Sequence, residues 1–268
     1  MKICITGYSG FLGSYILKKL SKKFSITKIN LKKMPDLEEK GFENFLDKFN
    51  KSNIIINCAA NMRPKNKRDF FINQDFPEIL DKHMKKKKKN FLIIHMSSTN
   101  VLIKDIKDPY TISKRIAEKK LANSKTTILR LPLLVDEKNG YLQNSGNLRF
   151  LFNYLNLNIL PVYPMIYPST RFEPLTLDRL LRFINKIILK KNKIKKIYNI
   201  SGRRKKSLWD IFEEIAKYKN KKVLKINLNK LNKLLPNFLK ESLRKNPSYL
   251  KHILMFDNSK YLGKKTIL

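Results

Sequence analysis

Glycine, cysteine and acidic residues are scarce in this chain of 268 residues. Asp and Glu number 21 against 58 Lys and Arg, and the formal net charge is +37. Lysines are spread singly and in pairs along the whole sequence, so we interpret the charge as a compositional bias; a basic arm would gather it in one segment. With 42% hydrophobic residues the chain can bury a core, which argues against disorder.

The two cysteines, Cys4 and Cys58, are too few for a disulfide framework or a metal site, and both lie in apolar runs that suit reduced, buried thiols. The sequence shows no run of about 18 uncharged apolar residues and no signal segment, so we expect a soluble, cytoplasmic protein without a membrane partner. The densest basic run, 85–89, is expected in an exposed turn, and no specific nucleic-acid partner is predicted.

The spacing of apolar residues alternates between the periods of strands and helices. Strands are predicted at 2–6, 24–30, 53–60, 90–98, 126–132 and 196–201, and helices at 11–20, 42–49, 70–84, 110–122, 176–191 and 208–218. Such an alternation indicates an α/β fold with a doubly wound parallel sheet of the Rossmann type. Residues 156–174 are rich in Asn and Pro, and irregular connections are predicted there.

Three of the eight glycines fall in one short turn, TGYSGFLG at 6–13, between the first strand and the first helix. Glycine there permits unusual dihedral angles and lets a pyrophosphate approach the amino terminus of the helix. The spacing is G-x-x-G-x-x-G, whereas the commoner fingerprint is G-x-G-x-x-G. A purely structural glycine turn is therefore the alternative interpretation.

A second motif, PYTISK, places Tyr110 and Lys114 four residues apart on one face of a predicted helix. A nearby ammonium is expected to lower the pKa of the tyrosine hydroxyl. The preceding strand supplies Ser97 and Ser98 at its carboxyl end, where doubly wound sheets bind ligands. His95, earlier in that strand, is expected to be a core histidine.

Taken in order, these motifs resemble the extended short-chain dehydrogenases/reductases of the NAD-dependent epimerase/dehydratase family. The resemblance rests on TGYSGFLG, NCAA, Asn73, SSTNV, YTISK followed by Glu118, and LRLP, and it continues through TRFEPLTLD to DNSKYLGKK. It implies a nicotinamide cofactor and a nucleotide-sugar substrate, and it leaves a homodimer open. It also implies a dinucleotide-binding core at 1–145, to which 172–200 return, and a smaller substrate-binding lobe formed by 146–171 and 201–268.

The resemblance further implies roles for individual residues. The cofactor would be bound by Gly7, Ser9, Gly10, Phe11, Leu12, Gly13, Asn30, Lys32, Ala59, Ala60, Asn73, Tyr110, Lys114 and Pro132. Ser98, Tyr110 and Lys114 would be catalytic, and Ser98 and Arg171 would contact the substrate. Because Asn30 and lysines follow the second strand in place of an acidic residue, NADP is favoured, while NAD stays open.

The motifs leave two classes of function. The first is a nucleotide-sugar reductase or epimerase that uses the Tyr-x-x-x-Lys pair, and the second is a noncatalytic NAD(P)-binding regulatory or RNA-binding protein of the same fold. Retention of both Tyr110 and Lys114 favours the enzyme. Thr99 and Asn100 replace the Asp-Glu pair of dehydratases, which argues against dehydration. The short connection before the third strand resembles dTDP-4-dehydrorhamnose reductases and does not settle the reaction.

Overall fold

The computed structural model describes residues 1–87, 90–104, 106–136, 153–156, 161–167, 171–189, 195–202, 205–227 and 266–267. The chain divides into two compact units. The first comprises Met1–Leu131, Leu177–Ile200 and Gly263–Leu268, and the second comprises Pro132–Thr176 and Ser201–Leu262. None of the helices in the described segments has the length and apolar character needed to cross a membrane.

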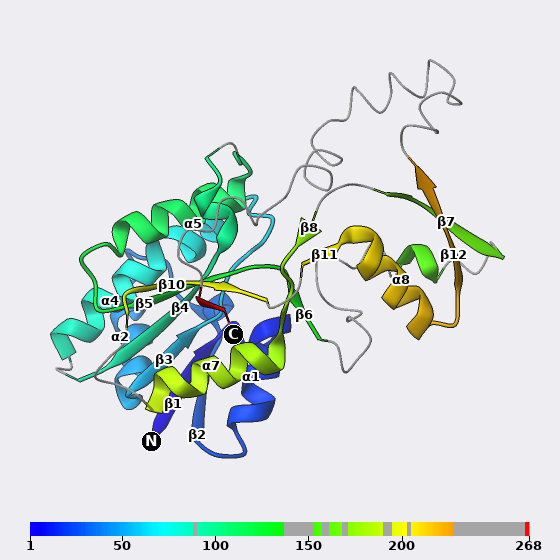
Figure 1. Ribbon diagram of the computed structural model, residues 1–268. Helices are drawn as coiled ribbons and strands as arrows, with labels where there is room; N and C mark the ends of the chain where they lie inside the picture. Colours follow the sequence, from blue (N-terminus) through cyan, green and yellow to red (C-terminus); the bar gives the residue numbers. More distant parts are fainter. Residues whose placement is uncertain are drawn as a thin grey trace. The chain divides into compact units, whose positions relative to one another are not determined.

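The first unit is a sheet flanked by helices (Figure 1). Its elements are β1 (Lys2–Thr6), α1 (Phe11–Leu20), β2 (Ser25–Ile29), η1 (Leu31–Lys33), α2 (Gly41–Asp47), η2 (Lys48–Lys51), β3 (Ile54–Asn57), α3 (Lys67–Phe70), η3 (Phe71–Asp75), α4 (Phe76–Lys87), β4 (Leu92–Ser98), η4 (Thr99–Leu102), α5 (Pro109–Lys120), β5 (Thr127–Leu131), α7 (Leu177–Leu189), β10 (Ile197–Ser201) and β13 (Thr266–Ile267). The strand order is β13-β10-β5-β4-β3-β1-β2, and the pairs from β10 to β2 are parallel. The predicted doubly wound α/β fold is confirmed.

The order of the strands changes direction between β1 and β3. β2 lies on one side of β1, whereas β3, β4, β5 and β10 follow on the other side. In sheets of this kind ligands bind outside the carboxyl ends of the strands at this switch point. A ligand is therefore expected at the turns that follow β1 and β3.

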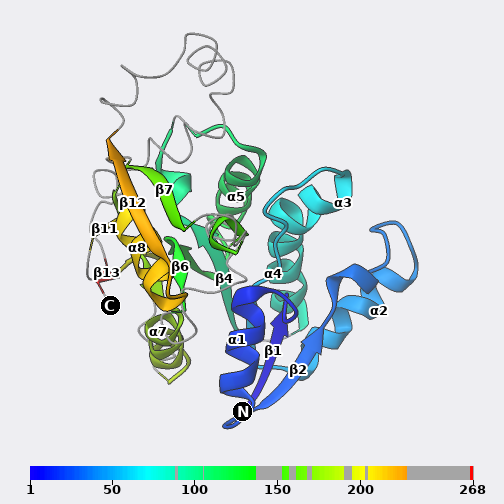
Figure 2. The same cartoon turned by 90° about the vertical axis from the view of Figure 1, so that its right-hand side faces the viewer.

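Helices cover both faces of this sheet. α1 and α7 lie side by side, and the Tyr15 hydroxyl donates a hydrogen bond to Asp178 between them, while α4 and α5 cover the opposite face (Figure 2). The three-and-four spacing of Phe42, Phe45 and Phe49 turns one side of α2 and η2 toward the sheet. There these rings form a buried cluster with strand residues and with α4, which includes Cys4, Ile29, Ile55, Phe76, Leu80, Met84 and Ile93.

The described part of the second unit contains three two-stranded sheets, the eleven-residue helix α8 and a short helical segment at 153–155. Its elements are β6 (Leu134–Val135), β7 (Val162–Tyr167), β8 (Arg171–Phe172), β9 (Leu175–Thr176), β11 (Lys206–Ser207), α8 (Leu208–Tyr218) and β12 (Lys222–Asn227). α8 begins with a capping box, in which the amide of Asp210 donates to Ser207 Oγ at 3.1 Å and the amide of Ser207 donates to Asp210 Oδ2 at 2.6 Å. The apolar face of α8 packs into a buried cluster with Tyr163.

The prediction of irregular structure at 156–174 is wrong for part of that segment. Residues 162–167 form β7, which pairs in parallel with β12, and 171–172 form β8, which pairs with β11. Pro164 lies inside β7 and lacks an amide hydrogen. Because each strand of a two-stranded sheet has one unpaired edge, a proline is tolerated there, and the rule that prolines interrupt strands does not apply.

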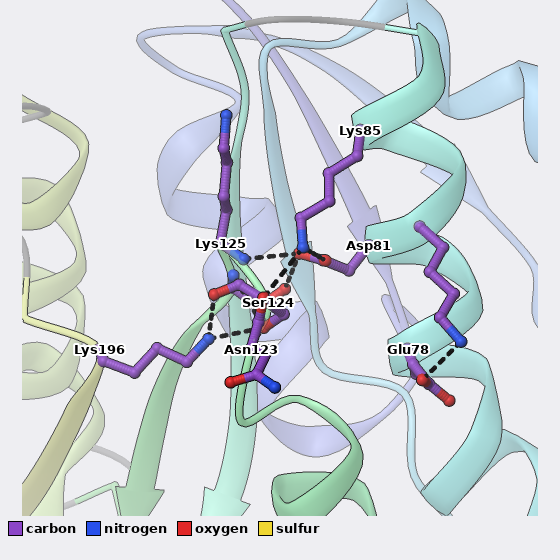
Figure 3. A network of polar contacts seen from close by, with 9 residues as sticks. Glu78, Asp81, Lys85, Asn123, Ser124, Lys125 and Lys196 are labelled. Atoms are coloured by element: carbon purple, nitrogen blue, oxygen red, sulfur yellow. Dashed lines mark hydrogen bonds and ion pairs between the residues drawn. The ribbon is translucent and has the colours of Figure 1, made fainter.

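One buried carboxylate fixes the turn between α5 and β5 at the amino end of the strand. Asp81, on α4, accepts hydrogen bonds from the amide of Lys125 at 3.1 Å and from the hydroxyl of Thr126 at 2.9 Å (Figure 3). Lys85, one helical turn later, pairs with the same carboxylate at 2.9 Å. Figure 3 also shows Lys196, which donates to Ser124 in this turn.

Candidate functional site

The turn after β1 packs so closely against the loop after β3 that it requires glycine. Gly7 has φ of +64°, and a Cβ atom there would lie 2.6 Å from the amide nitrogen of Ala59. A Cβ atom on Gly13 would lie 2.1 Å from the carbonyl oxygen of Gly7. The helix α1 is thereby held directly against the turn that precedes it.

The amino terminus of α1 is open to an anion. Its N-cap is Gly10, which has no side chain to cap the helix, and the first turn holds no acidic residue. Ser9 and Gly10 are exposed, and Phe11 and Leu12 are half-buried. Free amide groups at a helix terminus attract phosphate, so the residues present fit the pyrophosphate of a dinucleotide.

The turn after β2 is a short 3-10 helix with an exposed basic side. Asn30 caps η1, since its Oδ1 atom accepts a hydrogen bond from the amide of Lys32 at 3.0 Å. The side chains of Lys32 and Lys33 are exposed. The expected adenosine end of the site thus has cations and a neutral amide, and an acidic partner for a ribose is missing from 30–33.

Tyr110 lies in the first turn of α5 and is half-buried. Burial, followed by the charge of Asp108, raises the pKa of Tyr110 to about 12. The expectation that Lys114 lowers this pKa is therefore wrong. Removing the phenolate from water is costly, and the nearest carboxylate in the sequence is the N-cap of the same helix.

Lys114 is one of the largest fully buried side chains in the described residues. Its Nζ atom donates a hydrogen bond to the carbonyl oxygen of Met96 at 2.9 Å and lies 5.8 Å from the centre of the Tyr110 ring. Burial lowers the pKa of Lys114 to about 8, against the opposing effects of Cys58 and Glu118. The structure thus brings Tyr110 and Lys114 together on α5, as the four-residue spacing predicts.

Ser98 lies at the carboxyl end of β4 and is the N-cap of η4. Its Oγ atom accepts a hydrogen bond from the amide of Asn100 at 3.2 Å. This bond leaves the hydroxyl hydrogen of Ser98 free to point elsewhere. Thr99, the next residue, is buried, and its hydroxyl has no hydrogen-bond partner among the described residues.

Two rows of polar residues cross the sheet, and the contacts within each row were not predicted from the sequence. In the first row, Thr6 donates to Asn57 at 2.6 Å, and Asn57 Nδ2 lies 3.2 Å from His95 Nδ1. These three residues are direct neighbours in the register of β1, β3 and β4. Thr6 ends the strand predicted at 2–6, whereas Asn57 and His95 lie inside the strands predicted at 53–60 and 90–98, so no local pattern marked this row.

His95 is neutral in this row. Burial, and then the charge of Lys114, hold the pKa of His95 well below its usual range. If Asn57 Nδ2 donates to Nδ1, the proton of the neutral ring lies on Nε2, which has no partner among the described residues. His95 is thus a buried core histidine, as expected, but only one of its two ring nitrogens has a hydrogen-bond partner among the described residues.

The second row connects β4, α5, β5 and β10. Ser97 Oγ donates to Glu118 at 2.6 Å, and Glu118 accepts hydrogen bonds from Arg130. Arg130 also donates to Asn199 at 3.2 Å. Because Ser97, Arg130 and Asn199 are neighbours in register, this row fixes α5, and with it Tyr110 and Lys114, on the sheet.

Asn73 has a positioning role in the described contacts. It lies in the π-helix η3, and its amide group exchanges two hydrogen bonds of 2.8 Å with the backbone of Asn61, in the loop after β3. It also donates to Ser113 on α5 at 3.1 Å. π-Helices are frequent at functional sites, and here one joins the loop after β3 to the helix that carries Tyr110.

The remaining predicted residues are placed only in part. Ala59 is buried and Ala60 exposed in the loop after β3, and Pro132 directly follows β5. The backbone of Arg171 lies in β8 of the second unit, opposite Ser207, but its side chain lies outside the described residues. The segment DNSKYLGKK at 257–265 lies outside them as well.

Comparisons of the sequence with known proteins identify no relative: no protein-family model and no curated protein matches. Solved structures do match. A dTDP-4-dehydrorhamnose reductase from Clostridium acetobutylicum has a TM-score of 0.67 and 21% identity over 85% of this chain and 83% of that chain. The same enzyme from Bacillus anthracis, solved with NADP, has a TM-score of 0.66 and 18% identity over 86% and 85% of the two chains.

A structure with a different activity matches over a similar length. The UDP-glucuronic acid 4-epimerase from Bacillus cereus, solved with NAD, has a TM-score of 0.65 and 20% identity over 85% of this chain and 86% of that chain. The fold and the glycine turn at the switch point define a Rossmann-type α/β protein. More narrowly, the chain has the fold of the extended short-chain dehydrogenases/reductases, which the order of its motifs resembles.

Proposed function

We propose that this chain is an NAD(P)-dependent nucleotide-sugar reductase or epimerase of the extended short-chain dehydrogenase type. The burial of Lys114 beside the ring of Tyr110, in the same unit as the glycine turn, is the observation that carries the proposal. Burying an ammonium is costly, and such groups with shifted pKa values gather at functional sites. The neighbouring structures of both activities support the same assignment.

The first unit would bind the dinucleotide, which supplies or accepts the hydride when bound. The backbone of the turn and the open terminus of α1 would hold its pyrophosphate, through Gly7, Ser9, Gly10, Phe11, Leu12 and Gly13. Asn30 and Lys32 would contact the adenosine ribose, and Ala59, Ala60 and Pro132 would line the path to the nicotinamide. Asn73 would keep the loop after β3 in place for this contact.

In the reductase direction, Tyr110 would act as the acid. The carbonyl carbon of the sugar gains a hydride while Tyr110 Oη gives its proton to the carbonyl oxygen, so a hydroxyl forms, and solvent reprotonates the phenolate. Ser98 would donate a hydrogen bond to the reacting oxygen, and the Lys114 ammonium would stabilise the phenolate. With a pKa of about 12, Tyr110 is protonated at neutral pH, which favours the reductase over the epimerase, whose first step needs a base.

The second unit would bind the nucleotide sugar. In this proposal residues 146–171 and 201–268 form the substrate-binding lobe, and Arg171 pairs with the diphosphate of the substrate. Guanidinium groups suit phosphate because they donate two parallel hydrogen bonds. The solved structure of a neighbour with UDP-glucose supports this class of substrate.

The test combines mass spectrometry of the native protein with an assay of nicotinamide oxidation on a 4-keto nucleotide sugar. A retained NAD would favour the epimerase, whereas an empty site with turnover of added NADPH would favour the reductase. Tyr110→Phe should lower turnover by about a hundredfold or more and leave dinucleotide affinity intact. Tyr218→Phe, at an exposed tyrosine of α8, is the matched control. If Tyr110→Phe changes nothing, a noncatalytic dinucleotide-binding protein is the better interpretation.

A further inference from the structure

Arg68, in α3, joins the loops that follow β2 and β3, the two strands that flank β1 in the sheet. Its Nη2 atom donates to the carbonyl oxygens of Leu31 at 3.4 Å, Lys32 at 3.3 Å and Met34. Its Nη1 atom pairs with Asp36 at 3.1 Å. One guanidinium therefore binds the carboxyl end of η1, although its partners lie 32 to 37 residues earlier in the sequence.

The turn at 30–34 is held at both ends by these contacts. Asn30 caps its amino end through the amide of Lys32, and Arg68 satisfies carbonyl groups at its carboxyl end. The last carbonyls of a helix have no intrahelical partner, and charge-assisted hydrogen bonds satisfy them well. Such a turn presents its exposed side chains from a fixed backbone.

Hydrogen bonds also fix α3, the helix that carries Arg68. Asn66 caps α3 by accepting from the amide of Asp69 at 2.9 Å, and Asp69 accepts from the amide of Lys65 at 3.0 Å. Asn61 lies earlier in the loop that leads to α3, and the side chain of Asn73, in η3, holds its backbone by two hydrogen bonds. Since β2 and β3 are the two neighbours of β1, Arg68 ties together the loops on either side of the glycine turn.

Two charged groups near this turn, Asp36 and Arg68, form an ion pair with each other, and two lysines of the turn face solvent. Asp36, the nearest carboxylate to the lysines in the sequence, pairs with Nη1 of Arg68, and Nη2 of Arg68 contacts backbone carbonyl oxygens. Lys32 and Lys33 are exposed. Arg68 thus contacts the backbone of the turn and Asp36, whereas the two lysines are placed where a doubly wound fold meets the adenosine ribose.

We propose that Arg68 is a positioning residue that makes the site select NADP over NAD, because it holds the turn at 30–34 so that Lys32 and Lys33 meet the 2′-phosphate. The inference rests on the proposed dinucleotide function. Without the clamp the turn loses its fixed backbone and Asp36 loses its cation. Both changes weaken binding of a 2′-phosphate, and neither bears on the 2′-hydroxyl of NAD.

The experiment measures binding of NADP, NAD and adenosine 2′,5′-bisphosphate by calorimetry, and backbone hydrogen exchange at 30–36, in the full chain. Arg68→Lys keeps the positive charge but cannot reach three carbonyl groups, whereas Arg68→Met removes both the charge and the hydrogen bonds. Lys67→Met, on the same helix, is the matched control for the loss of one charge. Both Arg68 variants should bind NADP and the bisphosphate about tenfold more weakly, with NAD affinity changed less than about twofold. Exchange at 30–36 should quicken in both, and Lys67→Met should match the wild type.

Three results would overturn the inference. Equal affinity of the wild type for NADP and NAD would remove the selectivity while leaving the proposed function intact. A Lys67→Met variant as weak as Arg68→Met, with Arg68→Lys unchanged, would show that long-range charge acts and the clamp does not. Failure of the wild type to bind any of the three ligands would remove the proposed function itself.

Discussion

The Lys114 ammonium lies 5.8 Å from the centre of the Tyr110 ring and donates its hydrogen bond to the Met96 carbonyl oxygen instead of the phenol. Burial and Asp108 therefore set the pKa of Tyr110 in this structure, and both raise it. A protonated phenol beside a buried ammonium is arranged to donate a proton. The phenolate becomes favourable only after that proton has left, when the two opposite charges attract.

Asp108→Asn should lower the pKa of Tyr110. An asparagine at this position still caps α5, because its oxygen can accept from the amide of Thr111 as Asp108 does at 2.9 Å, but it carries no charge. The alkaline limb of the pH profile of kcat/KM should therefore move to lower pH. Glu38→Gln, at an exposed site, is the control and should leave the profile in place. An unmoved limb in Asp108→Asn would rule out Tyr110 as the group that titrates.

Lys114→Met should change how stability depends on pH. Folding lowers the pKa of Lys114 from 10.5 to about 8, so between these values the unfolded chain binds more protons than the folded one. The free energy of unfolding of the wild type should consequently rise with pH in this window, by about 3 kcal/mol relative to the variant. Urea unfolding of both proteins at pH 7, 8, 9 and 10 measures this difference. A constant difference across the series would mean that Lys114 is not buried as an ammonium.

Gly7→Ala should destabilise the protein far more than Gly10→Ala. The first change places a side chain at a φ of +64° and 2.6 Å from the backbone of Ala59, at an expected cost of about 3 kcal/mol. The second occurs at a φ of −79°, with its Cβ atom 3.3 Å from the Gly7 carbonyl oxygen, and should cost about 1 kcal/mol or less. Thermal unfolding compares the two, and equal costs would contradict the close packing of this turn.

Asp81→Ala should destabilise the first unit without touching the candidate site. The Asp81 carboxylate is 2% exposed and serves Lys85, Lys125 and Thr126, so its removal leaves buried polar groups without partners and should cost about 3 kcal/mol. Glu78→Ala, which breaks the pair between half-buried Glu78 and exposed Lys82 on the same helix, is the control and should cost less than about 1 kcal/mol. Dinucleotide affinity of the folded protein should be unchanged in both. Equal destabilisation by the two changes would argue that the turn before β5 is held by other contacts.

Residues close together in sequence were the easiest to place from the sequence. The helices predicted at 42–49 and 208–218 appear in the structure, one as α2 followed by η2 and the other as α8, because each depends on spacing and contacts within a few residues. The prediction for 162–167 failed because a strand forms there only through pairing with 222–227. No local pattern records such a partner.

The sequence by itself determined the order of strands and helices, the glycine turn, and the placement of Tyr110 and Lys114 on one helical face, since periodicity and spacing act over one or two turns of chain. Only the tertiary structure decided which acceptor Lys114 uses, why the Tyr110 pKa rises, and that Arg68 closes the turn after β2. These features depend on removal from water and on groups that meet across distant segments, and both arise only when the chain has folded.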